Sequence, residues 1–326
     1  MTVQLTRRAA IACSFILAAA PAFAQDAWPT APVHVFVGFP AGSSPDVLAR
    51  TITERLAQRL GQPVVIENRP GAGGVIGIQQ MLASSRDGHT FGTTINGPVT
   101  TSHRMMDSTG FDVETDIAPV TLIATSPLVL AVSTASGIED LESFMAIASA
   151  EPENILYGSV GQGSGAHLTA ELFAAEAGVS MLHVPFTSYA EVTTSILGGE
   201  IDAGFMAPSA ALPFVEAGTM RMLGITSTEP FAQAPDVAVM AGNAGLAETF
   251  RAELWNAFIA PANTDPAIIE RLNAEIHEIL GDPEVEDLLL SMGWQVAPST
   301  PEELRQRIVE DTAMWGAVID QVEAQQ

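Results

Sequence analysis

Residues 33–46 read Val-His-Val-Phe-Val-Gly-Phe-Pro-Ala-Gly-Ser-Ser-Pro-Asp, a β-branched run followed by a turn rich in glycine and serine. A stretch of helical period, residues 45–60, comes next, so this segment predicts a strand, a loop and a helix. In such a unit the N–H groups of the loop and the positive end of the helix dipole converge on one spot. The stretch therefore predicts an α/β fold and a place where an anion can bind.

The same unit recurs along the chain. Strands are predicted at residues 63–67, 155–158, 181–184 and 201–205, followed by helices at 74–84, 164–177, 188–197 and 209–217. Repeated strand–helix units with short turns predict mostly parallel sheets covered by helices on both faces.

The chain is long enough for two domains, since 326 residues exceed what one core usually supports. Two apolar stretches, residues 121–132 and 253–260, are long enough to run from one sheet into the other, and we expect them to form a hinge. The last part of the chain is predicted to be helical at 265–280, 283–292 and 301–324. We expect residues 25–125 and 252–326 to form one lobe and residues 126–251 the other.

Residues 1–24 have the pattern of a secretory signal peptide. Arg7 and Arg8 precede an apolar run at 11–20, which ends in Ala22-Phe23-Ala24. The run is shorter than the ~20 residues that cross a bilayer. We expect export to the periplasm, with the Sec and twin-arginine routes both open.

The composition excludes several classes of function. The chain has 38 acidic and 13 basic residues, all of the latter arginine, for a net charge of −25. Such a chain is repelled by nucleic acid and by anionic lipid, so we expect neither a nucleic-acid partner nor lipid insertion. The single cysteine, Cys13, lies in the signal, which excludes disulfides and thiolate chemistry from the mature chain. The six histidines lack ligand spacing, so no metal or cofactor is expected.

Two loops are candidates for binding. Residues 38–46 and residues 158–167 each join a strand to a helix and are rich in glycine and serine. The alternatives are a capped turn for the first loop and a mobile surface loop for the second. A third glycine-rich segment, residues 71–77, lacks the last glycine of the dinucleotide fingerprint because Ile76 stands there, so it predicts a turn into a close-packed helix.

The sequence also resembles a known family. Residues 37–50, Val-Gly-Phe-Pro-Ala-Gly-Ser-Ser-Pro-Asp-Val-Leu-Ala-Arg, and residues 60–74, Leu-Gly-Gln-Pro-Val-Val-Ile-Glu-Asn-Arg-Pro-Gly-Ala-Gly-Gly, are similar to the Bug family of periplasmic solute-binding proteins. These are receptors of tripartite tricarboxylate transporters. The likeness continues through nearly all of the mature chain, for example at residues 183–186 and 282–285.

The resemblance implies a two-lobed periplasmic-binding-protein fold, a type II venus flytrap, in which hinge strands join the lobes. It implies a small organic carboxylate bound between the lobes and delivered to membrane permease subunits. We expect a monomer, because that state suits a receptor that shuttles to the membrane. Carried over by motif, the first loop supplies Phe39, Ala41, Gly42, Ser43 and Ser44, and the second Ser159, Gly163, Ser164 and His167. The rest of the ligand would contact Asn96, Gly97, Thr187, Ser188, Phe205 and Met206.

Two departures from the family pattern bear on the ligand. Ser43 stands where a second glycine is usual. Phe205-Met206-Ala207 stands where the family often has Phe-Asp-Asn, so a polar wall becomes apolar. We therefore hypothesise a ligand whose distal end is less polar than that of aspartate or citrate.

Two other functions remain open at this point. A periplasmic serine hydrolase or transferase would use Ser159 or Ser164 as nucleophile and His167 as base, because Ser164 and His167 share a helix face. A ligand-presenting partner of a membrane sensor kinase would use the same cleft. No complete set of nucleophile, base and orienting group is visible, so we expect a receptor and not an enzyme.

Overall fold

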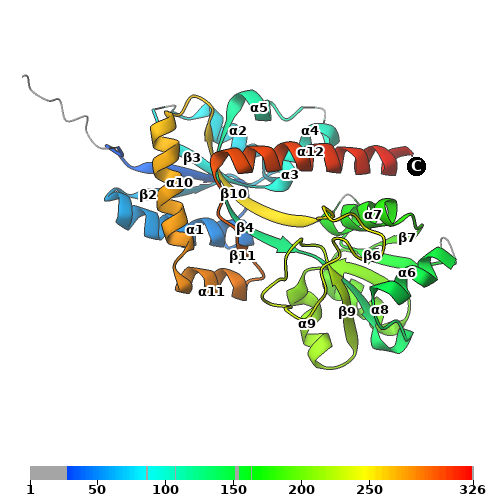
Figure 1. The fold of residues 1–326 in the computed structure, drawn as a ribbon. Helices are drawn as coiled ribbons and strands as arrows, with labels where there is room; N and C mark the ends of the chain where they lie inside the picture. Colours follow the sequence, from blue (N-terminus) through cyan, green and yellow to red (C-terminus); the bar gives the residue numbers. More distant parts are fainter. Residues whose placement is uncertain (1–27, 86, 107, 151–153, 163, 325–326) are drawn as a thin grey trace, which may run out of the picture.

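The computed structural model describes residues 28–324 except 86, 107, 151–153 and 163. The predicted signal at residues 1–24 lies outside these residues. The described chain forms two sheets, each covered by helices, in two lobes that lie side by side (Figure 1). The α/β, two-lobed fold expected from the sequence is confirmed.

Lobe 1 is defined here as the six-stranded sheet with strand order β11-β4-β10-β3-β1-β2 and the helices that pack on it. Its strands are β1 (Val33–Val37), β2 (Val64–Asn68), β3 (Thr90–Ile95), β4 (Ile117–Pro127), β10 (Glu253–Pro261) and β11 (Gln295–Val296). Its helices are α1 (Ser44–Leu60), α2 (Val75–Ala83), α3 (Asn96–Thr100), α4 (Ser102–Met105), α5 (Val113–Asp116), α10 (Pro266–Leu280) and α11 (Pro283–Ser291).

Lobe 2 is the five-stranded sheet with order β7-β6-β8-β5-β9 and its helices. Its strands are β5 (Val129–Ser133), β6 (Leu156–Ser159), β7 (Leu182–Pro185), β8 (Ala203–Met206) and β9 (Met220–Ile225). Its helices are α6 (Leu141–Ala150), α7 (Gly165–Ala177), α8 (Tyr189–Gly198) and α9 (Pro208–Glu216).

The hinge is formed where two chain segments pass between the sheets. The first passes from β4 to β5 through Leu128, and the second enters β10 through Ala252. Thr226 ties them together, because its hydroxyl donates to the carbonyl oxygen of Ala252 and accepts the N–H of Leu128 at 2.9 Å. Both crossings are therefore fixed to each other at one buried threonine.

The crossing strands change the sheets from mostly parallel to mixed. In lobe 1, β10 pairs antiparallel with both β3 and β4, and in lobe 2, β5 pairs antiparallel with β8 and β9. The strand–helix units themselves pair in parallel, as β1 does with β2 and β3. Of the two stretches expected to join the sheets, only residues 121–132 have strands in both, whereas β10 pairs within lobe 1 alone.

The C-terminal helix α12 (Pro301–Ala324) contacts both lobes. Leu304 and Ile308 belong to an apolar cluster of lobe 1, whereas Trp315, Val318 and Ile319 belong to the main cluster of lobe 2. A helix of 24 residues is about 36 Å long, which is enough to reach past the hinge. The lobe 1 segment expected at residues 252–326 therefore includes a helix half that packs on lobe 2. In the described part of the chain, no helix is both long and apolar enough to span a bilayer.

Candidate ligand-binding site

A cavity of about 160 Å³ lies where the two lobes meet at the hinge. Lobe 1 contributes the end of β3 and the start of α3, lobe 2 contributes the first turns of α7, and β10 and α12 supply the remaining walls. The lining residues are Ile95, Asn96, Gly97, Thr101, Leu128, Gly165, Leu168, Thr169, Ala252, Glu253, Leu254 and Trp315. Of the predicted site residues, Asn96 and Gly97 are in this wall, and Gly165 directly follows Ser164.

The first loop, residues 38–44, is held by the buried carboxylate of Asp46. This carboxylate accepts the N–H of Gly42 at 2.8 Å and Nε of Arg50 at 2.9 Å. Asn68 donates to its other oxygen at 2.7 Å and to the carbonyl oxygen of Phe39 at 3.0 Å. Burial raises the pKa of Asp46, but these hydrogen bonds outweigh it and hold the pKa below its usual value. Asp46 is therefore an ionised anchor for the loop and not a helix cap.

The start of α1 is left without a side-chain cap. Ser43 is the N-cap residue, but its hydroxyl donates to the carbonyl oxygen of Pro40 at 2.7 Å and makes no capping bond. The hydroxyl oxygen of Ser44 accepts Nε1 of Trp294 at 2.7 Å. The first-turn N–H groups of a helix have no acceptor within the helix, so this uncapped end can accept an anion.

Phe39 lies against the glycine-rich turn that the sequence analysis predicted to pack closely. A Cβ placed on Gly74 would lie 3.0 Å from the Phe39 ring, and one on Gly38 would lie 2.5 Å from the Gly74 carbonyl oxygen. A Cβ on Gly77 would lie 2.5 Å from the Gly38 Cα atom. The segment at residues 71–77 therefore supports the first loop by close backbone contact, as expected.

The second loop, which follows β6, is held by a hydrogen-bonded serine–histidine pair. The Ser159 hydroxyl lies 2.7 Å from Nε2 of His183, and its oxygen accepts the N–H of Gly161 at 3.2 Å. Ser164 is the N-cap of α7 and accepts the N–H of His167 at 3.2 Å. The hydroxyl of Ser159 is fully buried, so it acts here as a part of the scaffold.

Aromatic rings stack beneath this loop. The imidazoles of His167 and His183 are 4.1 Å apart, and Tyr157 stacks on His183 at 5.0 Å. Tyr157 donates its hydroxyl to Glu171 at 2.5 Å. Burial lowers the pKa of both histidines. At His183 the neighbouring His167 lowers it further, and the pKa falls to about 4. At His167 the negative charge of Glu171 opposes the effect of burial. Both rings are therefore neutral near pH 7.

The remaining predicted residues lie in separate parts of the chain. Ala41 is exposed at the tip of the first loop, and Gly163 lies outside the described residues. Ser188 is the N-cap of α8, and the Thr187 hydroxyl donates to Glu191 at 2.9 Å, so both stabilise that helix start. Phe205 and Met206 are fully buried in the apolar clusters on the two faces of β8.

This position corrects the expected role of residues 205 and 206. Strand β8 is the central strand of lobe 2, so helices cover both of its faces. Phe205 contacts Phe173 of α7, with ring centroids 5.5 Å apart. In this structure their side chains are core packing and do not line the cavity.

The ten other lining residues were missed at the sequence level, among them Leu128, Glu253, Leu254 and Trp315. Glu253 offered a signal, since it is the one acidic residue in the apolar stretch at 253–260. Trp315 gave none, because an apolar residue on a long helix is usually core. No group of acidic, histidine or cysteine side chains in the described residues could hold a metal ion.

Solved structures of similar fold include ligand-bound proteins. One from R. palustris, solved with adipate, is 28% identical, matches 90% of this chain and 97% of its own, and has a TM-score of 0.69. MatC from Rhodopseudomonas palustris, with bound malate, is 27% identical, matches 89% and 99% of the two chains, and has a TM-score of 0.64.

Among sequence relatives, BugT of Bordetella pertussis is 33% identical over 97% of this chain and 98% of its own. A protein encoded in the tcbD–tcbE intergenic region of Pseudomonas sp. strain P51 is 32% identical over 95% and 92% of the two chains. The family model described as "Tripartite tricarboxylate transporter family receptor" matches residues 48–324. The chain belongs to this family of solute receptors.

Proposed function

We propose that this receptor captures a small organic carboxylate between its two lobes and delivers it to the membrane subunits of a tripartite tricarboxylate transporter. The observation that carries the proposal is the uncapped start of α1 in lobe 1, because the Ser43 hydroxyl is turned away to Pro40. That end offers N–H donors and a positive dipole to an anion without any basic side chain. The α7 start of lobe 2, next to Ser164, lies at the cavity between the lobes.

The ligands of the related structures support a carboxylate. Adipate and malate are both small carboxylates, and they are bound by proteins 28% and 27% identical to this chain. The ligand would bridge the first loop and the second loop and so favour a closed arrangement of the lobes, which the permease recognises. The chain would act as a monomer. It would do so in the periplasm, a location that the secretory pattern at residues 1–24 supports.

The serine hydrolase alternative finds little support in the geometry. Ser159 is paired with His183 and not with His167, and it is fully buried. Ser164 uses its hydroxyl oxygen to accept the backbone N–H of His167, which is a helix cap. We therefore infer a receptor without hydrolytic activity, and expect no release of p-nitrophenol from p-nitrophenyl esters above the buffer rate.

Thermal shift against a panel of carboxylates, each paired with its amide, tests the proposed function. A ligand at 100 times its Kd adds roughly 2.7 kcal/mol to the stability of the folded state, which moves Tm by several degrees. We expect a shift with at least one carboxylate and none with its amide. Shifts with neutral solutes alone would contradict the proposal.

A variant then locates the site. Asn96→Ala should weaken the binding of that carboxylate about tenfold, because Asn96 lines the cavity at the end of β3. Asn243→Ala, on an exposed turn of lobe 2 that is not part of the cavity wall, is the matched control and should leave Kd within about twofold.

A further inference from the structure

The cavity at the hinge has an unusual charge distribution for an anion receptor. Most of its wall is apolar, and its uncharged polar side chains are Asn96, Thr101 and Thr169. Its one charged side chain is Glu253, and no arginine or histidine is among the lining residues. A carboxylate placed in this cavity would meet a negative charge and no cation.

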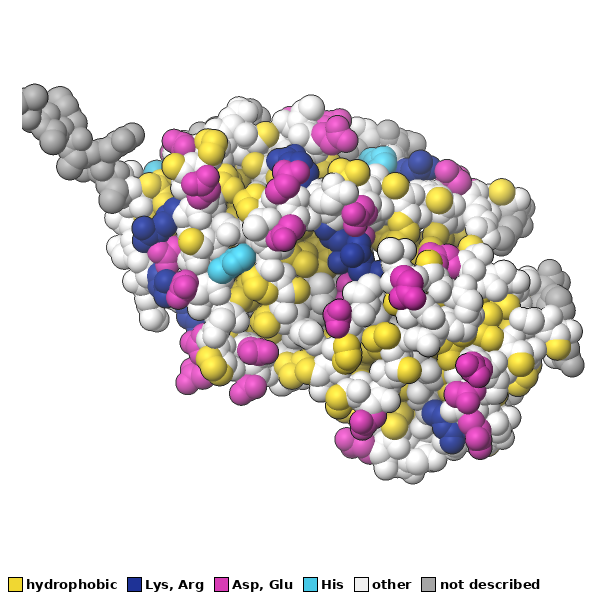
Figure 2. Space-filling view, in the orientation of Figure 1, with side chains coloured by type: hydrophobic (Ala, Val, Ile, Leu, Met, Phe, Trp, Pro, Cys, Tyr) yellow, Lys and Arg dark blue, Asp and Glu magenta, His cyan; other side chains and the backbone are white. Residues whose placement is uncertain are grey.

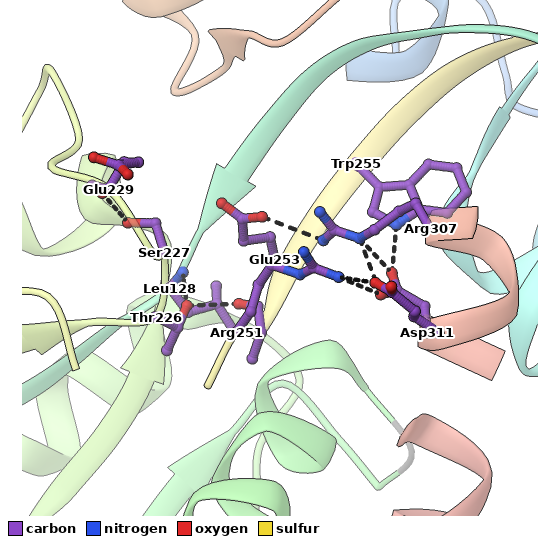
Figure 3. A network of polar contacts seen from close by, with 11 residues as sticks. Leu128, Thr226, Ser227, Glu229, Arg251, Glu253, Trp255, Arg307 and Asp311 are labelled. Atoms are coloured by element: carbon purple, nitrogen blue, oxygen red, sulfur yellow. Dashed lines mark hydrogen bonds and ion pairs between the residues drawn. The ribbon is translucent and has the colours of Figure 1, made fainter. Parts of the chain in front are cut away.

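Glu253 belongs to a network that does not neutralise it. Its only ion pair with an arginine of α12 is to Nη2 of Arg307, at 3.2 Å. The Nε atom of the same arginine donates to both carboxylate oxygens of Asp311, at 2.9 and 3.0 Å. Figure 3 shows Arg307 between these two carboxylates.

The second arginine of the network is also shared. Nη2 of Arg251 lies 3.2 Å from Glu310 and 3.4 Å from Asp311. Asp311 further accepts Nε1 of Trp255 at 2.7 Å. Two guanidinium groups therefore serve three carboxylates, and one negative charge is left without its own partner.

Of the three carboxylates, Glu253 is the one whose negative charge is least compensated. Asp311 has both arginines and an indole N–H, and Glu310 is half exposed to water. The Glu253 side chain is only 10% exposed. Burial raises the pKa of Glu253, and the attraction of Arg307 and Arg251 offsets this only in part. A second anion nearby would add to a charge that is already poorly solvated.

We propose that Glu253 is a specificity-determining residue that excludes a second carboxylate from the hinge side of the cleft. The ligand class is then a monocarboxylate, whose charged end binds at the loops and whose uncharged, largely apolar remainder occupies the cavity. This inference rests on the proposed function. The sequence predicts a ligand with a less polar distal end because of residues 205 and 206. Glu253 provides a different physical reason for the same expectation.

Calorimetry with ligand pairs of equal length tests the inference. The probes are hexanoate against adipate, and benzoate against terephthalate, titrated at pH 7.5. Wild type should bind the monocarboxylate of at least one pair about tenfold or more tightly than its dicarboxylate. Glu253→Gln keeps a hydrogen-bond acceptor for Arg307 but removes the charge, and should reduce that preference about tenfold by strengthening the dicarboxylate.

Glu310→Gln is the matched control. It removes one negative charge from the same network, but at a half-exposed residue that does not line the cavity, so the preference should stay at the wild-type value. An equal effect of both variants would overturn the inference, because a general change of charge would then explain it.

If Glu253→Gln does not fold, binding measurements on the wild type alone still test the inference. Monomethyl adipate, which differs from adipate by one added methyl group and has one charge, should bind more tightly than adipate. Equal or tighter binding of adipate would overturn the role of Glu253 while leaving a carboxylate receptor in place. Failure of every carboxylate to bind would instead remove the proposed function, and this inference with it.

Discussion

The two glycine-rich loops, one in each lobe, are both held in place by side-chain hydrogen bonds, but one anchor is charged and the other is neutral. In lobe 1 the loop at residues 38–44 is tied to an ionised, buried Asp46, with Arg50 and Asn68 as its partners. In lobe 2 the loop after β6 is tied to a neutral pair, Ser159 and His183. Each is a short connection from a parallel strand to a helix. A glycine-rich turn can thus be fixed either by charge or by uncharged hydrogen bonds and stacking.

The difference implies different responses to mutation and to acid. A charged anchor contributes several strong hydrogen bonds that fail together when the carboxylate is removed. A neutral imidazole contributes fewer bonds. Because burial opposes its protonation in the folded state, lowering the pH destabilises this anchor at a higher pH than it destabilises the charged one. The predictions below separate these two behaviours, from the largest expected effect to the smallest.

Removing the charged anchor should have the largest effect. Asp46→Ala leaves the N–H of Gly42 without its acceptor and removes one of the two acceptors of the Asn68 amide, and should lower the free energy of unfolding by about 3 kcal/mol. Urea denaturation measures it. Glu54→Ala, at an exposed position of the same helix, is the control and should change stability by less than about 0.5 kcal/mol. Equal losses of unfolding free energy in the two variants would show that Asp46 does not stabilise the fold more than an exposed residue of the same helix.

Removing the neutral anchor should cost less. His183→Phe keeps a flat ring against Tyr157 but leaves the buried Ser159 hydroxyl without its ring partner. We expect a loss of about 1.5 kcal/mol in the same urea experiment. A loss as large as that of Asp46→Ala would contradict the comparison between the two loops.

The histidines should make lobe 2 sensitive to mild acid. The unfolded chain protonates histidine near pH 6.5, whereas the folded pKa of His183 is about 4, so the unfolded state binds more protons between these values. Stability contributed by the neutral ring is complete above pH 6.5 and falls as the pH drops toward 4. We expect wild type to lose on the order of 1 kcal/mol more than His183→Phe between pH 7 and pH 5. Parallel pH profiles of Tm for the two proteins would refute this.

The two N-cap serines should show the smallest difference. Ser164 caps α7 through its side chain, so Ser164→Ala should cost about 1 kcal/mol. Ser43 makes no cap, and Ser43→Ala should cost no more than about 0.3 kcal/mol. Chemical denaturation of the two variants side by side gives the comparison, and a reversed order would mean that Ser43 caps α1 in solution.

Much of the fold could be predicted from sequence because local signals agree with the final structure. The strand at residues 33–37 has the expected bounds, and α10, α11 and α12 begin at Pro266, Pro283 and Pro301, each within one residue of its predicted start. The antiparallel pairing of the crossing strands was not foreseen, because direction depends on where the other lobe places the chain. The same holds for α12, whose second half packs on lobe 2.

The candidate site was less predictable, because its scaffold depends on contacts between distant residues. Asn68 reaches Asp46 across 22 positions, and His183 reaches Ser159 across 24. Neither partner follows from spacing. The expectation for Phe205 failed for another reason: at the end of a central strand both faces are covered, so an apolar pair there becomes core.

Small-angle X-ray scattering of the protein with and without a carboxylate that raises its Tm tests the central claim most directly. If one ligand engages a loop from each lobe, the lobes move together and the radius of gyration decreases on saturation. The matching amide, which does not shift Tm, should leave the scattering unchanged. A carboxylate that binds at saturation with no change in the radius of gyration would contradict a ligand held between the two loops.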